Sequence, residues 1–148
     1  MTSTGSQAED ENVPDRSIGY MKRDGAWKPN TDTLPYRGTS AGGGYSTVED
    51  LTRFASALTE NKLLNAHYTE LLTTGKADTG GGGKYAYGFN DTTVQGVRSF
   101  GHGGGAPGMN GELRIYPDSG YVVAVLVNLD PPAASRIADA LGERLPAN

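Results

Sequence analysis

The sequence predicts an α+β domain in which an antiparallel β-sheet of three to five strands is packed by a C-terminal helix and one or two further helices. Two observations predict this fold class. Apolar residues recur at helical spacing in the middle of the chain and again near its end. Strand-like runs between them are joined by short turns rich in glycine. Consecutive strands with tight turns form antiparallel sheets, and helices bury their apolar faces against such sheets.

The first third of the chain carries few regular patterns. Residues 1–13 are polar and acidic, lack the apolar segment of a signal peptide, and are predicted to form a disordered tail. Residues 14–148 are predicted to form a single domain, which is long enough for one moderate core. Within it, residues 14–40 are rich in turn formers and should be mostly irregular, with a short hairpin over 18–21 and 26–28.

A helix is predicted from Ser46 onward, because Ser46 and Glu49 fit a capping box. Thr47 and Asp50 repeat a weaker version of the pattern one residue later, and the helix should end near Glu60. The apolar residues behind this cap that recur at helical spacing are Leu51, Phe54, Ala55 and Leu58.

Two further helices are predicted. One covers Asn65–Thr73, with Leu71 and Leu72 facing the core. The other, after two prolines, covers Ala133–Leu145 and ends the chain. The apolar stripe of this last helix consists of Ile137, Leu141 and Leu145.

Strands are predicted over four segments that lie between these helices. The last segment is apolar on both faces, so it should be buried on both sides. Residues 117–120 form the turn that precedes it. The four segments are residues 85–89, 94–100, 111–117 and 121–128.

A histidine followed by a run of glycines lies between the second and third of these segments. Glycines let the backbone approach a ligand where any side chain would block it. We therefore predict a binding site at His102, Gly103, Gly104 and Gly105, on one wall of a cleft. His102 would supply a hydrogen bond to the ligand, and the Gly105 N–H would be one donor of an oxyanion hole. The alternative is a flexible glycine-rich turn with an exposed histidine.

Several motifs follow one another along the chain: residues 40–51 (SAGGGYSTVEDL), Tyr87-Gly88-Phe89, His102-Gly103-Gly104 with Pro107-Gly108, Tyr116-Pro117 and Leu126-Val127-Asn128. In order and spacing they resemble the serine β-lactamase-like hydrolases, which include class C β-lactamases, penicillin-binding proteins and related esterases. The resemblance spans residues 36–128. One departure is that the second glycine of the family's Tyr-Gly-x-Gly strand is not matched.

The resemblance implies hydrolysis of an amide or ester through an acyl-serine. Candidate substrates are β-lactams, D-Ala-D-Ala-type peptides or simple esters, and a histidine in place of the family's lysine is shared with its esterase and peptidase branches. The family's nucleophile is the serine of Ser-x-x-Lys. No serine of this chain has a lysine three residues later, although Thr59–Lys62 and Thr73–Lys76 have that spacing. The second family motif, Tyr-x-Asn or Ser-x-Asn, is absent too.

The chain is therefore identified as the C-terminal portion of such a hydrolase, without its N-terminal strands and all-helical region. It is expected to be inactive alone and to contain no catalytic nucleophile. Its expected partners are a small-molecule or peptide substrate in the full-length parent, and an N-terminal half or a second copy at an open sheet edge. Two alternatives stay open: a non-catalytic binding or interaction module, and a subunit that completes an active site with a separate N-terminal fragment.

Composition excludes other classes. The net charge is −4, without the clustered lysines and arginines of a nucleic-acid surface. With two histidines and no cysteine, neither a metal site nor any other cofactor is expected. No apolar run approaches the roughly 20 residues of a membrane span. The resemblance implies the cell envelope or an extracytoplasmic site. A self-contained Ser–His hydrolase would have to use Ser99 or Ser40, but no Gly-x-Ser-x-Gly elbow is present.

Overall fold

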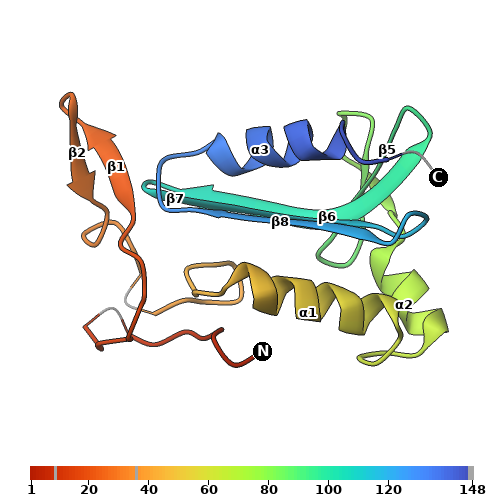
Figure 1. Ribbon diagram of the computed structural model, residues 1–148, viewed down its shortest axis with the longest axis horizontal. Coiled ribbons are helices and arrows are strands. Elements are labelled where there is room, and N and C mark those ends of the chain that lie inside the picture. The colour runs from red at the N-terminus through yellow and green to blue at the C-terminus, as the bar shows by residue number, and fades with distance from the viewer. Residues whose placement is uncertain (9, 36, 147–148) are drawn as a thin grey trace.

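The computed structural model describes residues 1–8, 10–35 and 37–146, and confirms the α+β class. A six-stranded antiparallel sheet lies between α3 on one face and α1 on the other (Figure 1). Its strand order follows the chain. The helices and strands are β1 Tyr20–Arg23, β2 Ala26–Pro29, α1 Val48–Thr59, α2 Ala66–Thr73, β3 Ala77–Asp78, β4 Lys84–Tyr85, β5 Asn90–Val94, β6 Val97–Ala106, β7 Met109–Tyr116, β8 Tyr121–Val127 and α3 Ala133–Gly142.

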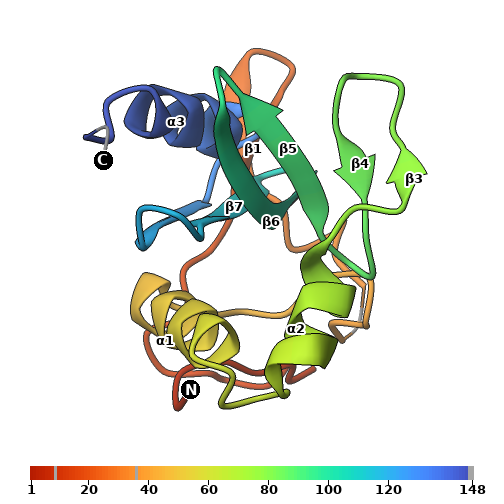
Figure 2. The ribbon, with the colours of Figure 1, turned by 90° about the vertical axis from the view of Figure 1, so that its right-hand side faces the viewer.

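The sheet has more strands than the three to five expected, because short or weakly patterned segments join it. β3 and β4 are two residues each. β5 begins with polar residues that gave no strand pattern, and the turn at Gln95–Gly96 divides the predicted strand 94–100. The predicted strand 85–89 is wrong beyond Tyr85, because the backbone turns at Gly88, whose φ is +83°. Figure 2 shows β3 and β4 at one end of the sheet, beyond β5.

The N-terminal caps of the first two helices use side-chain oxygens, as helix termini require. The cap of α1 is Thr47, whose Oγ1 accepts a hydrogen bond from the Asp50 backbone N–H at 3.2 Å. The capping box predicted for Ser46 is therefore wrong, and the pattern one residue later is the one used. The Ser46 hydroxyl instead lies 2.8 Å from that of Thr4. Asn65 caps α2 in the same way.

Two apolar clusters hold the layers together, one on each face of the sheet. β8 contributes to both, with Val123 and Val125 toward α3 and with Val122 and Ala124 toward α1, which agrees with its predicted burial on both sides. The buried residues on the α1 side are Ala55, Leu58, Ala86, Phe89, Phe100, Leu113 and Ile115. Those on the α3 side are Tyr116, Val123, Val125, Ala134 and Ala138.

The inward face of α3 differs from the predicted one. Ala134 and Ala138 are buried, whereas Ile137 and Leu141 are 45% and 46% exposed. Small residues occupy the inward face because the helix lies close to large side chains on β7 and β8. Leu145 packs against the same cluster, as expected, but the helix ends at Gly142 and not at Leu145. In α2, Leu72 packs inward, but Leu71 is half exposed.

The described residues of the N-terminal segment have defined contacts, where the sequence led us to expect a disordered tail. Gly5 pairs with Tyr45, and Ala8 is fully buried. The backbone N–H groups of Thr2 and Ser3 donate to the buried carboxylate of Asp50. The segment thus runs beside the start of α1 (Figure 1). The composition gave no sign of this, because the partners are far apart in sequence: Asp50 lies 47 residues from Ser3 and 48 from Thr2.

Candidate functional site

The four predicted site residues, His102 to Gly105, lie in strand β6 and not in a turn. β6 continues to Ala106 and returns as β7 through a two-residue turn. On its other side β5 pairs with β6 only as far as Gly101. From His102 onward the outer edge of β6 therefore has no neighbouring strand in the described part of the chain. This exposed backbone edge is the central feature of the candidate site.

The register shows which backbone groups reach this edge. In an antiparallel pair, the residues of one strand direct their N–H and C=O groups alternately to its two sides. The turn that closes Val94 with Val97 and the turn that closes Ala106 with Met109 are both two residues long. The two residues that flank such a turn hydrogen-bond to each other, so the N–H and C=O groups of Val97 face β5 and those of Ala106 face β7. Counting along β6 from either turn gives the same result. The N–H and C=O groups of Gly103 and Gly105 point away from β7, toward the edge that β5 leaves open.

The imidazole of His102 lies on the α1 side of the sheet, on the face that carries Phe100 two residues earlier. It is exposed, and its Nε2 lies 3.1 Å from the hydroxyl oxygen of Tyr85. The two rings meet edge to face, with centroids 5.9 Å apart and an interplanar angle of 75°. Ser99 lies on the opposite face, where its hydroxyl is 3.2 Å from that of Thr92. The structure therefore does not bring Ser99 and His102 together.

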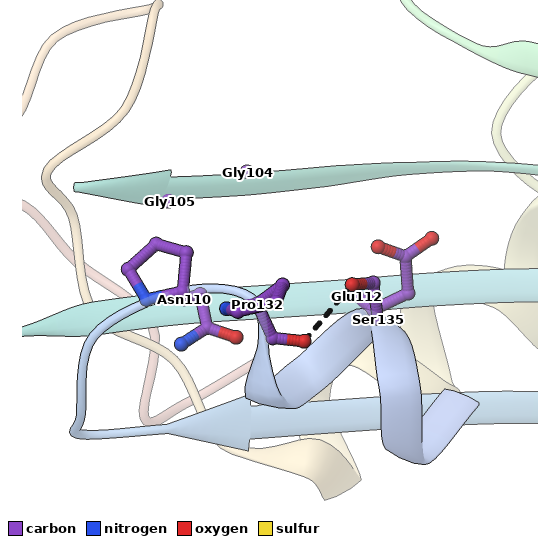
Figure 3. A pocket seen from close by; sticks show the side chains of 8 residues that line it. Gly104, Gly105, Asn110, Glu112, Pro132 and Ser135 are labelled. Atoms are coloured by element: carbon purple, nitrogen blue, oxygen red, sulfur yellow. Dashed lines mark hydrogen bonds between the residues drawn. The ribbon is translucent and has the colours of Figure 1, made fainter. Parts of the chain in front are cut away.

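A small pocket lies on the α3 side of the same strand end, opposite the imidazole. Its volume is about 160 Å³. Figure 3 shows Asn110, Glu112, Pro132 and Ser135 around it, with Gly104 and Gly105 on β6. A Cβ atom on Gly103 would overlap the Glu112 carboxylate. On this face, the Glu112 side chain therefore occupies the space directly beside the Gly103 backbone.

The charges beside this pocket are paired with one another. Arg114 donates from Nε to Glu112 at 3.0 Å and from Nη1 to Asp139 at 2.7 Å. Burial alone would lower the pKa of Arg114, but the hydrogen bonds that it donates to the Asp139 and Glu112 carboxylates raise this pKa. Arg114 therefore stays charged and bound to these two acids, so it serves the packing of α3 and not the open edge of β6.

Two polar side chains that the sequence analysis missed hold the turn between β6 and β7. Asp130 accepts hydrogen bonds from the backbone N–H of Gly108 at 2.8 Å and of Lys22 at 2.7 Å. Asn30, 1% exposed, donates to the Pro107 carbonyl at 2.8 Å. They join the β1–β2 hairpin to the tip of the glycine strand. No local pattern could have shown this, because the partners are 22 to 108 residues apart.

The described residues offer neither a metal site nor a membrane-spanning helix. Residues 1–8, 10–35 and 37–146 contain no group of three or more histidine, cysteine, aspartate or glutamate side chains placed to hold a metal ion. Within the same residues, no helix combines the length and the apolar character needed to cross a bilayer.

Comparison with known proteins establishes the family. The model of the Beta-lactamase family matches residues 1–147, so the chain belongs to that family. The motifs that suggested the resemblance in the sequence thus lie in a segment that the family model covers almost completely. No curated protein gives a significant match.

Solved structures agree. A penicillin-binding protein from Bacillus halodurans superposes with a TM-score of 0.89 at 30% identity, over 96% of this chain and 44% of that one. An octameric penicillin-binding protein homologue from Pyrococcus abyssi gives 0.81 at 27% identity, over 96% and 34%. A D-stereospecific amidohydrolase from Streptomyces sp., at 24% identity and a TM-score of 0.74, shares the fold over 91% and 42%. The chain thus spans less than half the length of these three proteins.

Proposed function

We propose that this chain is the C-terminal portion of a serine hydrolase that cleaves an amide or ester through an acyl-serine. In this proposal it supplies one wall of the active-site cleft. The observation that carries it is the open edge of β6 beside His102, in a chain of the β-lactamase family. A Gly105 N–H that points to this edge has the direction required of an oxyanion-hole donor.

In this proposal, the covalent step depends on groups supplied from outside these 148 residues. Acyl transfer needs a nucleophile, a base and oxyanion donors together. The chain has no Ser-x-x-Lys, and the hydroxyl of Ser99 is directed to Thr92 on the far face of β6. The chain alone is therefore expected to be inactive. Its parent would act on a small-molecule or peptide substrate, and the amidohydrolase among the structural neighbours favours an amide.

The unpaired edge of β8 supports the proposal that the sheet is completed by segments from the rest of the hydrolase. β8 is the last strand of the sheet, and the register that orients β6 directs the N–H and C=O groups of Val122, Ala124 and Leu126 away from β7. The β1–β2 hairpin reaches only the end of this edge, where the Tyr20 N–H donates to the Asn128 carbonyl. A strand from the remaining hydrolase would complete the sheet here.

The first test is intact mass spectrometry of the 148-residue chain after incubation with a fluorophosphonate and, separately, with a penicillin. We expect an unmodified mass from a sample whose circular dichroism shows a folded protein. A stoichiometric adduct that maps to one serine would overturn the claim that the nucleophile lies outside this chain.

A chimera provides the complementary test. The chain would replace the matched region of the Bacillus halodurans penicillin-binding protein, which the TM-score of 0.89 makes geometrically reasonable. We expect stoichiometric acylation of the chimera by one of the two reagents. A matched chimera with Ser119→Ala, in the distant β7–β8 turn, should acylate equally. A folded chimera that neither reagent acylates would contradict the proposal.

The open β8 edge also favours the alternative that this chain is a subunit completed by a separate N-terminal fragment. Activity that appears only when such a fragment is added would identify this arrangement. Saturable binding of a penicillin or a D-Ala-D-Ala peptide without turnover, in both the chain and the chimera, would instead identify a binding module.

A further inference from the structure

The contact between Tyr85 and His102 joins two exposed residues from strands that are not neighbours in the sheet. Tyr85 lies on β4 and His102 on β6, beyond the point where β5 stops. The backbone of Tyr85 is held by pairing with Ala77 and Asn90 and by the Lys76 N–H, which donates to its carbonyl at 2.9 Å. The backbone from which the tyrosine ring projects is therefore held by its own strand, and the ring and hydroxyl contact His102.

Hydrogen-bond chemistry gives this contact a direction. A neutral imidazole has one nitrogen that donates and one that accepts. A phenol is a better donor than acceptor, and an imidazole nitrogen is a better acceptor than a phenol oxygen. The 3.1 Å separation between the Tyr85 hydroxyl and Nε2 is thus best satisfied with the hydroxyl as donor.

We propose that Tyr85 is a positioning residue for His102: its hydroxyl donates to Nε2, orients the ring and places the imidazole proton on Nδ1. An unconstrained histidine prefers the Nε2–H tautomer, so this contact reverses the usual preference. No described side chain contacts Nδ1 with a hydrogen bond. The Nδ1–H group is then a neutral donor beside the open edge of β6, suited to a carbonyl or carboxylate oxygen of a ligand.

Only the last step, the meeting of Nδ1–H with a substrate oxygen, rests on the proposed function. The orientation and the tautomer are properties of the chain itself. They can be measured in the 148-residue protein without any activity.

The test is long-range ¹H–¹⁵N correlation spectroscopy of the imidazole rings at about pH 8, where an imidazole is ordinarily neutral. The chain has only two histidines, and His67 lies exposed on α2, where its ring meets the ring of Tyr68 edge to face. We expect the pattern of the Nδ1–H tautomer for His102 and the ordinary Nε2–H pattern for His67. In Tyr85→Phe, the Nδ1–H pattern of His102 should be lost, while His67 is unchanged.

Tyr87→Phe is the matched control, because Tyr87 is 62% exposed and its hydroxyl forms no hydrogen bond with the described residues. It removes a phenol two residues away and should leave the His102 pattern intact. A wild-type His102 that is mainly Nε2–H, or a pattern that Tyr85→Phe does not alter, would overturn the inference. Backbone amide spectra of each variant verify that the fold persists.

The acylation rate of the chimera then separates this inference from the proposed function. There, Tyr85→Phe is expected to slow acylation roughly 10- to 100-fold, and Tyr87→Phe much less, because a misplaced group loses much of its effect. If no chimera is acylated but the tautomer changes as expected, the proposed function fails and the inference stands. If the tautomer is insensitive to Tyr85, the inference fails whatever the rate.

Discussion

Asp50 is a fully buried carboxylate that fastens the N-terminal segment to the first turn of α1. Burial would raise its pKa, but hydrogen bonds from the Ser3 N–H, the Thr4 hydroxyl, the Thr2 N–H and Arg53 outweigh that effect and hold the pKa at about 2. The ordinary value is 3.8. A depressed pKa in the folded state means that the ionised carboxylate stabilises the fold above pH 3.8, and that this contribution is lost as the pH falls through about 2.

We therefore predict that Asp50→Asn lowers the free energy of unfolding at neutral pH, because an amide nitrogen would face N–H donors. The difference from the wild type should shrink between pH 3.8 and about 2, where the wild-type carboxyl becomes protonated. Urea unfolding at a series of pH values measures it. Glu49→Gln is the control: it makes the same charge change in the same helical turn, at an exposed position. Equal effects of the two substitutions would contradict this role of Asp50.

The glycines of β6 are not equivalent. A Cβ atom on Gly101 would overlap the Leu113 carbonyl oxygen of β7, whereas one on Gly104 would meet nothing within 4 Å. Gly101→Ala should therefore force β6 away from β7 and cost about 1–3 kcal/mol of unfolding free energy. Gly104→Ala should cost well under 1 kcal/mol. Chemical denaturation of both variants tests this, and a similar loss in the two would show that the β6–β7 register is wrong.

A functional or structural role of a single residue can be predicted from the sequence when it depends on neighbours in the chain, and not when it depends on contacts with distant residues. The glycine run and His102 could be proposed from the sequence because a histidine beside glycines is a contiguous pattern. Asn30 and Asp130 were not found, because their partners lie on distant strands and an isolated asparagine or aspartate in a loop has many roles. The sequence predicts a strand at Tyr85, but its contact with His102 depends on β5 beginning only at Asn90, opposite Gly101.

At the scale of elements, α3 provides the clearest correction. A three-residue stripe of large apolar residues predicted one face, but the buried face carries Ala134 and Ala138. Such a stripe shows that a helix is amphipathic, but it does not show how closely the helix approaches its sheet. β5 was missed for a related reason: its polar sequence, Asn-Asp-Thr-Thr-Val, lies in a half-buried strand that has little apolar alternation.

Substitutions on α3 test this assignment of faces. Ala138→Leu should destabilise the protein by about 1–3 kcal/mol, because the added atoms have no room against β7 and β8. Ile137→Ala should cost less than about 1 kcal/mol, since Ile137 is 45% exposed. Thermal or urea unfolding of the two variants gives the comparison. A larger loss for Ile137→Ala would restore the face that the sequence pattern predicted.

At the scale of the whole molecule, two stretches of unpaired backbone differ in character: the end of β6 beyond Gly101 and the outer side of β8. The edge of β6 beyond Gly101 is short, rich in glycine and flanked by His102, which suits a ligand. The edge of β8 is apolar and seven residues long, which suits another strand. The sequence predicts a binding site at the glycine run and an open sheet edge. Both expectations come from the family resemblance, because the order of the motifs implies the family's antiparallel sheet. The register that orients each backbone group could come only from the structure.

The β8 edge leads to the last prediction: the 148-residue chain alone self-associates by strand addition at β8. Leu126→Pro should abolish this association while the fold is kept, because the Leu126 N–H points outward and its side chain is 43% exposed. Val125→Pro is the contrast, since its N–H bonds to β7 and its side chain is buried, so it should destabilise the sheet by about 3 kcal/mol or more. Sedimentation velocity over a range of concentrations measures association, and circular dichroism measures the fold. A folded Leu126→Pro variant that associates as the wild type does would show that β8 is not the edge that binds another chain.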